Sequence, residues 1–246
     1  MKAKLLADQP ALGVSVMIPS VQIVEMLGRL GFDWVLIDCE HGSIGIESVE
    51  LMVMAAEAAG ITPIVRPASN SARDILQVMD RGAAGVQVPH VCTADDARRA
   101  VASVRYDPDG RRGLAVGTRS ADYGYLESMS EYVARANREA LVCVQIEDAE
   151  ALDNLDAILA VPGIDVFFVG PSDLSQSMGH AGNAGAAPVR AAIERTFDAI
   201  LAAGGVAGTP CTSANIEALK ARGVRYLYTH LTRLLEQSSR TILDKR

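Results

Sequence analysis

Short runs rich in β-branched residues alternate along the chain with longer stretches in which apolar residues recur every three or four positions. Several short runs, such as Val35-Leu36-Ile37, are continuously apolar, as expected for strands of a parallel sheet that is covered on both faces. The short runs predict eight strands, at 13–19, 34–40, 62–67, 85–91, 141–147, 166–170, 206–210 and 226–229.

The longer stretches predict helices. Residues 46–59 place Val49, Met52, Val53 and Ala56 at the three- and four-residue spacings of one helix face, and residues 149–161 repeat the pattern. Ser71, Thr93 and Ser213 stand where N-terminal caps belong. Glycines stand where C-terminal caps belong, at positions 31, 60, 82, 204 and 223.

Eight strand–helix units predict an α/β fold, a closed (β/α)8 TIM barrel, forming one domain over residues 1–246. The length of 246 residues suits one such barrel. An open doubly wound sheet is the alternative, but the G-x-G-x-x-G usual after its first strand is missing. One segment, about 107–124, is rich in glycine and arginine and too long for an ordinary connection, so we expect an inserted functional loop.

The composition narrows the classes of function. The net charge is −7 and no basic run occurs, which disfavours nucleic-acid binding. No apolar stretch is long enough to span a bilayer. The four cysteines are scattered without a C-x-x-C pair, which disfavours a zinc ribbon or a disulfide scaffold. These features predict a cytoplasmic protein with reduced thiols.

Ionisable residues follow four of the predicted strands, where each strand ends. In a barrel, catalytic groups lie at the C-terminal ends of the strands. One strand ending in a polar loop is ordinary, but four together favour an active site. These residues are Asp38, Glu40 and His41; Arg66; Glu147 and Asp148, with Gln145 just before; and Ser172 and Asp173.

Residue chemistry suggests roles for some of them. Glu147 and Asp173 offer the oxygen ligands that Mg²⁺ or Mn²⁺ prefers. His41 is the candidate general base, because imidazole titrates near neutral pH; the alternative is a structural histidine. Arg66 is suited to a substrate carboxylate, or to an ion pair with Asp38 or Glu40. No role follows for His90 or Cys39. No lysine ends a predicted strand, which disfavours a Schiff-base mechanism.

Five segments, in order and over nearly the whole chain, resemble the motifs of the HpcH/HpaI aldolases. Members of this family are metal-dependent, class II pyruvate aldolases that act on 4-hydroxy-2-oxo acids. The segments are GFDWVLIDCEH at 31–41, IVRP at 64–67, RYDPDGRRG at 105–113, QIE at 145–147 and FVGPSDLS at 168–175.

The resemblance implies cleavage or formation of 4-hydroxy-2-oxo acids, to or from an aldehyde and pyruvate or a similar 2-oxo acid such as hydroxypyruvate, through a metal-stabilised enolate. It implies a divalent metal (Mg²⁺, Mn²⁺ or Co²⁺) and a homohexamer with active sites near subunit boundaries. The implied roles are general base for His41, carboxylate paired with that histidine for Asp80, enolate stabilisation for Arg66, metal ligation for Glu147 and Asp173, 2-oxo acid binding for Gln145, Asp173 and the backbone at Ser172, and a loop position near the aldehyde for Arg119.

The sequence departs from the family at Cys39 and at Ala187-Pro188, where His-Pro is common, so the aldehyde stays open. Two enzymes of the same superfold are alternatives: a lyase of acyl-CoA hydroxyacid thioesters and a 2-oxo acid decarboxylase. A non-catalytic ligand-binding barrel is a remote third alternative.

Overall fold

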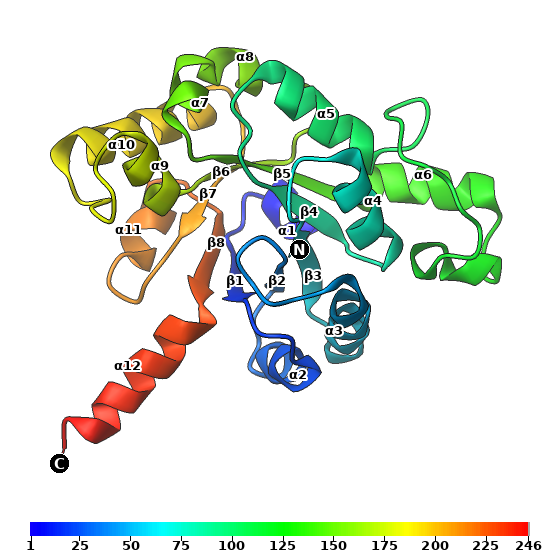
Figure 1. The fold of residues 1–246 in the computed structure, drawn as a ribbon, viewed down its shortest axis with the longest axis horizontal. Helices are drawn as coiled ribbons and strands as arrows, with labels where there is room; N and C mark the ends of the chain where they lie inside the picture. The colour runs from blue at the N-terminus through cyan, green and yellow to red at the C-terminus, as the bar shows by residue number, and fades with distance from the viewer. Residues whose placement is uncertain (246) are drawn as a thin grey trace.

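Eight parallel strands close into a barrel in the order of the sequence, and helices surround it (Figure 1). The computed structural model describes residues 1–245; Arg246, the last residue of the predicted domain, lies outside it. The (β/α)8 barrel expected from the sequence is thereby confirmed. The strands are β1 (Ala11–Val16), β2 (Trp34–Asp38), β3 (Thr62–Arg66), β4 (Gly85–Val88), β5 (Leu141–Ile146), β6 (Val166–Val169), β7 (Ala207–Pro210) and β8 (Tyr226–His230).

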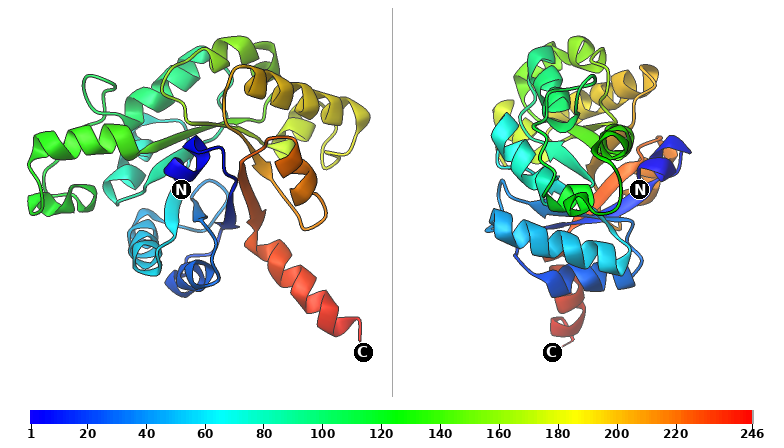
Figure 2. Two further views of the ribbon diagram at one scale, coloured as in Figure 1. Left: turned by 180° about the vertical axis from the view of Figure 1, so that it is seen from behind. Right: turned by 90° about the vertical axis from the view of Figure 1, so that its right-hand side faces the viewer.

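The helices form an outer layer, and the last of them leaves it: α12 projects away from the body in two views (Figures 1 and 2). The long loop after α5 carries a short 3₁₀ segment, η1 (Arg119–Gly124). The helices are α1 (Lys2–Leu6), α2 (Val21–Arg29), α3 (Ile46–Ala59), α4 (Ala72–Asp80), α5 (Ala94–Val104), α6 (Met129–Glu139), α7 (Ala149–Asp153), α8 (Leu155–Leu159), α9 (Pro171–Ser177), α10 (Ala187–Ala202), α11 (Ile216–Ala221) and α12 (Leu231–Leu243).

Two predictions about the helices were wrong, and two strands differ in their bounds: 13–19 was predicted for β1 and 85–91 for β4. The single helix expected over 149–161 is split into α7 and α8 at Asn154, whose side-chain amide donates to the carbonyls of Cys92 and Glu150. Ser213 is not a cap, because Asn215 precedes α11 and its Oδ1 accepts the N–H of Thr212 at 2.7 Å. The expected caps at Ser71 and Thr93 are confirmed, as are the five glycines, which all have positive φ.

The barrel interior is aromatic at its N-terminal end and polar at its C-terminal end. Alternate residues of each strand point inward, so β2 contributes Trp34, then Leu36, then Asp38. The ring centroids of Trp34 and Tyr226 lie 4.1 Å apart, and these two rings fill the N-terminal end of the interior. Gly13 leaves room for them, because a Cβ there would lie 2.4 Å from the indole ring. The same inward rows that build the core therefore end in the polar residues of the site.

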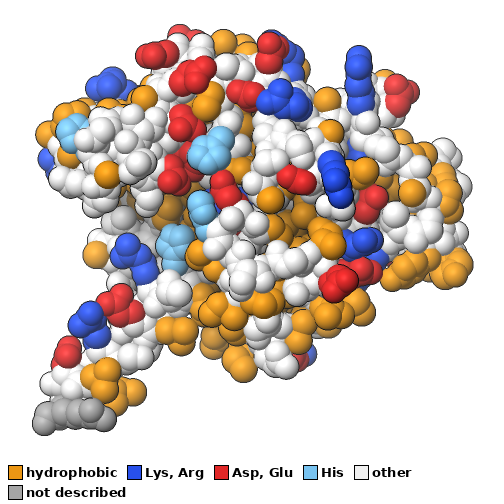
Figure 3. Space-filling view, in the orientation of Figure 1, with side chains coloured by type: hydrophobic (Ala, Val, Ile, Leu, Met, Phe, Trp, Pro, Cys, Tyr) orange, Lys and Arg blue, Asp and Glu red, His pale blue; other side chains and the backbone are white. Residues whose placement is uncertain are grey.

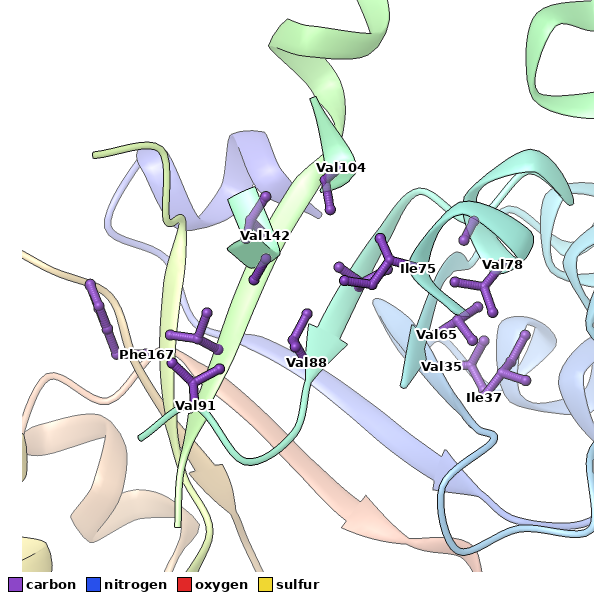
Figure 4. Close-up of a cluster of buried hydrophobic side chains, with 14 of the residues drawn as sticks. Val35, Ile37, Val65, Ile75, Val78, Val88, Val91, Val104, Val142 and Phe167 are labelled. Atoms are coloured by element: carbon purple, nitrogen blue, oxygen red, sulfur yellow. The ribbon is translucent and has the colours of Figure 1, made fainter. Parts of the chain in front are cut away.

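The outward rows of the strands pack on the helices. Val35, Ile37 and Val65 belong to one buried cluster with Ile75 and Val78 of α4, and this cluster continues around the barrel (Figure 4). Burial of such side chains contributes about 1.5–3 kcal/mol each and fixes the helices on the strands. Among residues 1–245, none of the helices combines the length and apolar character that a membrane crossing requires.

Candidate active site

A buried ion pair joins the ends of β2 and β3, where Asp38 and Arg66 are partners in the strand register. Arg66 donates from Nε to Asp38 Oδ1 at 2.9 Å and from Nη2 to Oδ2 at 2.5 Å. Its Nη1 lies 3.1 Å from Glu40 Oε2. Burial alone would raise the pKa of Asp38, but the Arg66 guanidinium holds it below its usual value. Arg66 is therefore a fixed cation, and both ion pairs considered from the sequence are present.

A row of side-chain amides continues from this pair across the barrel. Gln145 Oε1 accepts from Gln87 Nε2 at 2.6 Å and from Arg66 Nη1 at 3.4 Å. Gln87 Oε1 in turn accepts from the Tyr226 hydroxyl at 3.1 Å. Gln145 Nε2 is left as a donor and bonds Glu147 Oε2. The network thus sets the orientation of both Gln145 and the carboxylate beside it.

Glu147 is an almost fully buried carboxylate, and the Nδ1 of the His90 ring lies 3.7 Å from its Oε1. Burial raises the pKa of Glu147 to about 7, the backbone N–H and charge of His90 oppose the rise, and the negative charges of Glu40 and Asp173 add to it. Gly170 makes space for this side chain, since a Cβ at that position would lie 2.7 Å from Glu147 Oε2. A cation beside Glu147 would lower the cost of ionising it.

These residues fit a divalent cation. Glu147 and Asp173, the latter in the first turn of α9, supply two carboxylates whose charges act on one another. Within residues 1–245, no group of three or more His, Cys, Asp or Glu side chains is arranged to hold a metal. Two carboxylates are what Mg²⁺ commonly takes from a protein, with water and substrate oxygens completing its shell.

His41 lies at the mouth of the barrel, with half of its side chain exposed. Its Nε2 lies 3.7 Å from Glu40 Oε2. The turn that presents it is held by Asp38, whose Oδ1 accepts the backbone N–H groups of Glu40 at 3.0 Å and His41 at 3.3 Å. His41 is thus accessible to a substrate, near the fixed Arg66.

Two of the predicted site residues lie elsewhere. Asp80 is the last residue of α4, which runs back toward the N-terminal end of the barrel for about 14 Å, and it accepts from Arg112 Nη2 at 2.7 Å. Arg119 pairs with Glu57 near the end of α3, its Nη1 3.1 Å from Glu57 Oε1. One chain therefore does not bring Asp80 to His41, because a barrel helix ends at the face opposite the strand ends.

Ser172 and Cys39 flank the site. Ser172 is exposed in the first turn of α9, where backbone N–H groups lack partners within the helix, so its backbone is available to a substrate carboxylate. Burial raises the pKa of the Cys39 thiol to about 12. Cys39 is therefore protonated at neutral pH and unsuited to nucleophilic chemistry.

His90 belongs to the site, although no role for it followed from the sequence. It follows β4, its backbone N–H donates to Glu147 Oε1 at 2.9 Å, and its ring lies between Glu40 and Asp148. Burial lowers the pKa of His90, but Asp148, Glu147 and Glu40 raise it above its usual value. Acidic and histidine side chains accordingly gather near the middle of the face shown in Figure 3. The feature of the sequence that could have indicated His90 was its position near the end of a predicted strand.

The chain is similar to known proteins over most of its length. Residues 15–222 match the model of the HpcH/HpaI aldolase/citrate lyase family. Two proteins named 5-keto-4-deoxy-D-glucarate aldolase, from Shigella boydii serotype 18 and Escherichia coli O139:H28, are 37% identical over 207 residues, which are 84% of this chain and 79% and 80% of theirs.

The chain is also similar to solved structures over nearly its whole length. A family protein from Burkholderia cenocepacia J2315 is 31% identical with a TM-score of 0.93, and the match covers 99% of this chain and 97% of that one. A citrate synthase, SbnG, is 30% identical with a TM-score of 0.88, and the match covers 100% and 98%. The chain therefore belongs to the HpcH/HpaI aldolase/citrate lyase family and is an aldolase, a carbon–carbon lyase.

Proposed function

We propose that the protein is a divalent-metal-dependent aldolase that cleaves or forms 4-hydroxy-2-oxo acids, to or from an aldehyde and pyruvate or a similar 2-oxo acid. The observation that carries this proposal is the buried Glu147, with its raised pKa, beside Asp173 and at the same barrel end as Arg66 and His41. That end holds two carboxylates that would bind a hard divalent cation. It also holds the fixed guanidinium of Arg66 and the exposed imidazole of His41.

The residues divide the reaction between them. The carboxylate of the 2-oxo acid meets the backbone at Ser172 and the Gln145 amide, which orient it. Glu147 and Asp173 would hold a divalent cation, which would polarise the 2-oxo carbonyl and stabilise negative charge on its oxygen. Arg66, locked by Asp38, adds a second positive charge at that oxygen.

His41 moves the proton. During cleavage its imidazole accepts the proton of the 4-hydroxyl, and the O–H electron pair forms the aldehyde carbonyl. The C3–C4 bond pair passes to the 2-oxo acid fragment as its enolate, which gains a proton at C3 from water to give pyruvate, and the protonated His41 returns its proton to the solvent. General acid–base help of this kind contributes ~10²–10⁴-fold. Condensation follows the same steps in reverse.

The relatives suggest a first substrate. Counted from its keto end, 5-keto-4-deoxy-D-glucarate, the compound named in those relatives, is itself a 4-hydroxy-2-oxo acid. The test is pyruvate release from this compound before and after a chelator, with Mg²⁺, Mn²⁺ or Co²⁺ added back. Release restored only by metal supports the proposal, and release that survives exhaustive chelation refutes the metal dependence.

A second candidate comes from the likeness to the citrate synthase: carbon–carbon chemistry on an acyl-CoA thioester. The mouth of the site carries Glu40, Asp148 and Asp173, and these acidic residues disfavour the phosphates of CoA. Formation of free CoA from an acyl-CoA and a 2-oxo acid, together with no aldol cleavage, would favour this candidate.

We also propose a cytoplasmic homohexamer. The projecting α12 lies beside a cavity of about 450 Å³ that includes Phe32, Ile216 and Leu234 in its lining, a surface suited to another subunit. Asp80 and Arg119 lie at the barrel end opposite His41, so any role in catalysis requires a neighbouring chain. The four unpaired cysteines suit a reducing compartment. Light scattering on the purified protein measures the assembly, and a monomer would refute it.

A further inference from the structure

His90 has a backbone conformation that residues other than glycine seldom adopt. It comes two residues after the end of β4, and its φ is +52°, in the left-handed region. A side chain with a Cβ is disfavoured there, and glycine is not. Such conformations persist where surrounding contacts hold them, and they cluster at functional sites.

The left-handed turn directs the backbone N–H of His90 at Glu147. The N–H donates to Glu147 Oε1 at 2.9 Å, while Oε2 accepts from Gln145 Nε2. Both oxygens of this buried carboxylate are therefore held. One donor is the backbone N–H of His90, which follows β4, and the other is the side-chain amide of Gln145 on β5. Carboxylates that bind metals are commonly oriented by such outer hydrogen bonds.

The ring of His90 supplies the contacts that hold the turn. Its Nε2 lies 3.2 Å from Glu40 Oε1 and its Nδ1 lies 3.0 Å from Asp148 Oδ2. More than half of the side chain is exposed, so apolar packing does not hold the ring in place. These two polar contacts tie the loop after β4 to residues that follow β2 and β5.

We propose that His90 is a positioning residue: its ring, held by Glu40 and Asp148, keeps its backbone left-handed, so that its N–H fixes Glu147 in the orientation that binds the metal. The proposal rests on the proposed function, in which Glu147 is a metal ligand. His90 acts through Glu147 and does not touch the reacting atoms.

The test compares Mn²⁺ affinity, measured by the loss of the free-ion electron paramagnetic resonance signal, for wild type and for His90→Ala, His90→Gly and His90→Asn. We expect His90→Ala to weaken binding by about tenfold. His90→Gly removes more of the side chain, yet it should bind several-fold more tightly than His90→Ala, because glycine adopts the turn freely. His90→Asn, which tolerates this conformation and keeps hydrogen-bonding groups, should stay close to wild type.

Controls separate the possible failures. Asp8 also has a left-handed φ, +57°, far from the site, so Asp8→Ala should leave Mn²⁺ affinity unchanged. Equal Mn²⁺ affinity of wild type and Glu147→Gln would refute the metal site itself, and this proposal with it. If Glu147→Gln loses Mn²⁺ while His90→Ala binds like wild type, or while His90→Gly binds no better than His90→Ala, the proposal for His90 alone is overturned.

Discussion

Replacing Glu147 with glutamine should stabilise the metal-free protein at high pH, although the residue lies at the centre of the site. The pKa of Glu147 is about 7 in the folded protein and about 4.3 in an unfolded chain. A group whose pKa is raised by folding stabilises the protein at low pH, and this contribution is lost as the pH rises through the folded value. At about 1.4 kcal/mol per pH unit, wild type loses about 3 kcal/mol between pH 4.5 and 8.

Glutamine avoids that loss, because it does not ionise. Its amide nitrogen would face the donor Gln145 Nε2, so one hydrogen bond is lost at a cost of about 1 kcal/mol. Glu147→Gln should therefore be more stable than wild type by about 2 kcal/mol at pH 8, and equal to it within about 1 kcal/mol at pH 5.

Urea unfolding in a chelator, followed by circular dichroism, measures this difference in free energy of unfolding at both pH values. Adding Mn²⁺ should then stabilise wild type, by about 2.7 kcal/mol at a hundred times the dissociation constant, and leave Glu147→Gln unchanged. A stability difference that is the same at pH 5 and pH 8 would refute the assignment of Glu147 as a buried carboxylate whose pKa is raised by folding.

Three further predictions concern the site. His41→Ala should slow aldol cleavage by ~10²–10⁴-fold while Mn²⁺ affinity stays within about twofold of wild type; turnover like that of wild type would remove His41 as the base. Gly170→Ala should displace Glu147 and weaken Mn²⁺ binding, because the added Cβ would lie 2.7 Å from Glu147 Oε2. The control Gly45→Ala, whose added Cβ would have no atom within 4 Å, should leave Mn²⁺ binding unchanged. Co-expressed His41→Ala and Asp80→Asn subunits, each inactive alone, should regain activity in mixed oligomers; continued inactivity would argue against a shared site.

The barrel could be predicted because its strands produce a recognisable pattern of apolar residues in the sequence. Strands covered on both faces need continuous apolar runs, and β2, β3 and β5 begin where the runs predicted. The polar ends of those runs located Arg66 and Glu147 correctly at one end of the barrel. Inward alternation by two residues would also have indicated Gln87, which follows Gly85 on the inner row of β4.

Other features depend on contacts that the sequence does not show. The left-handed backbone of His90 rests on partners that follow two other strands, so only the folded chain shows it. The break at Asn154 comes from a hydrogen bond to Cys92, 62 residues away. The position of Asp80 could have been predicted from the sequence, because a helix that follows a strand returns to the opposite end of the barrel.

Exchange of the methyl protons of pyruvate into D₂O reports enolate formation without requiring the aldehyde, so it shows whether the protein forms the enolate only with a metal. Proton NMR would follow wild type with a chelator, wild type with Mg²⁺ or Mn²⁺, and Glu147→Gln with the same metals. We expect rapid exchange for wild type with metal only, and exchange at the background rate in the other two samples. Exchange by wild type that persists in excess chelator, or by Glu147→Gln at the wild-type rate, would contradict a metal-dependent aldolase centred on Glu147.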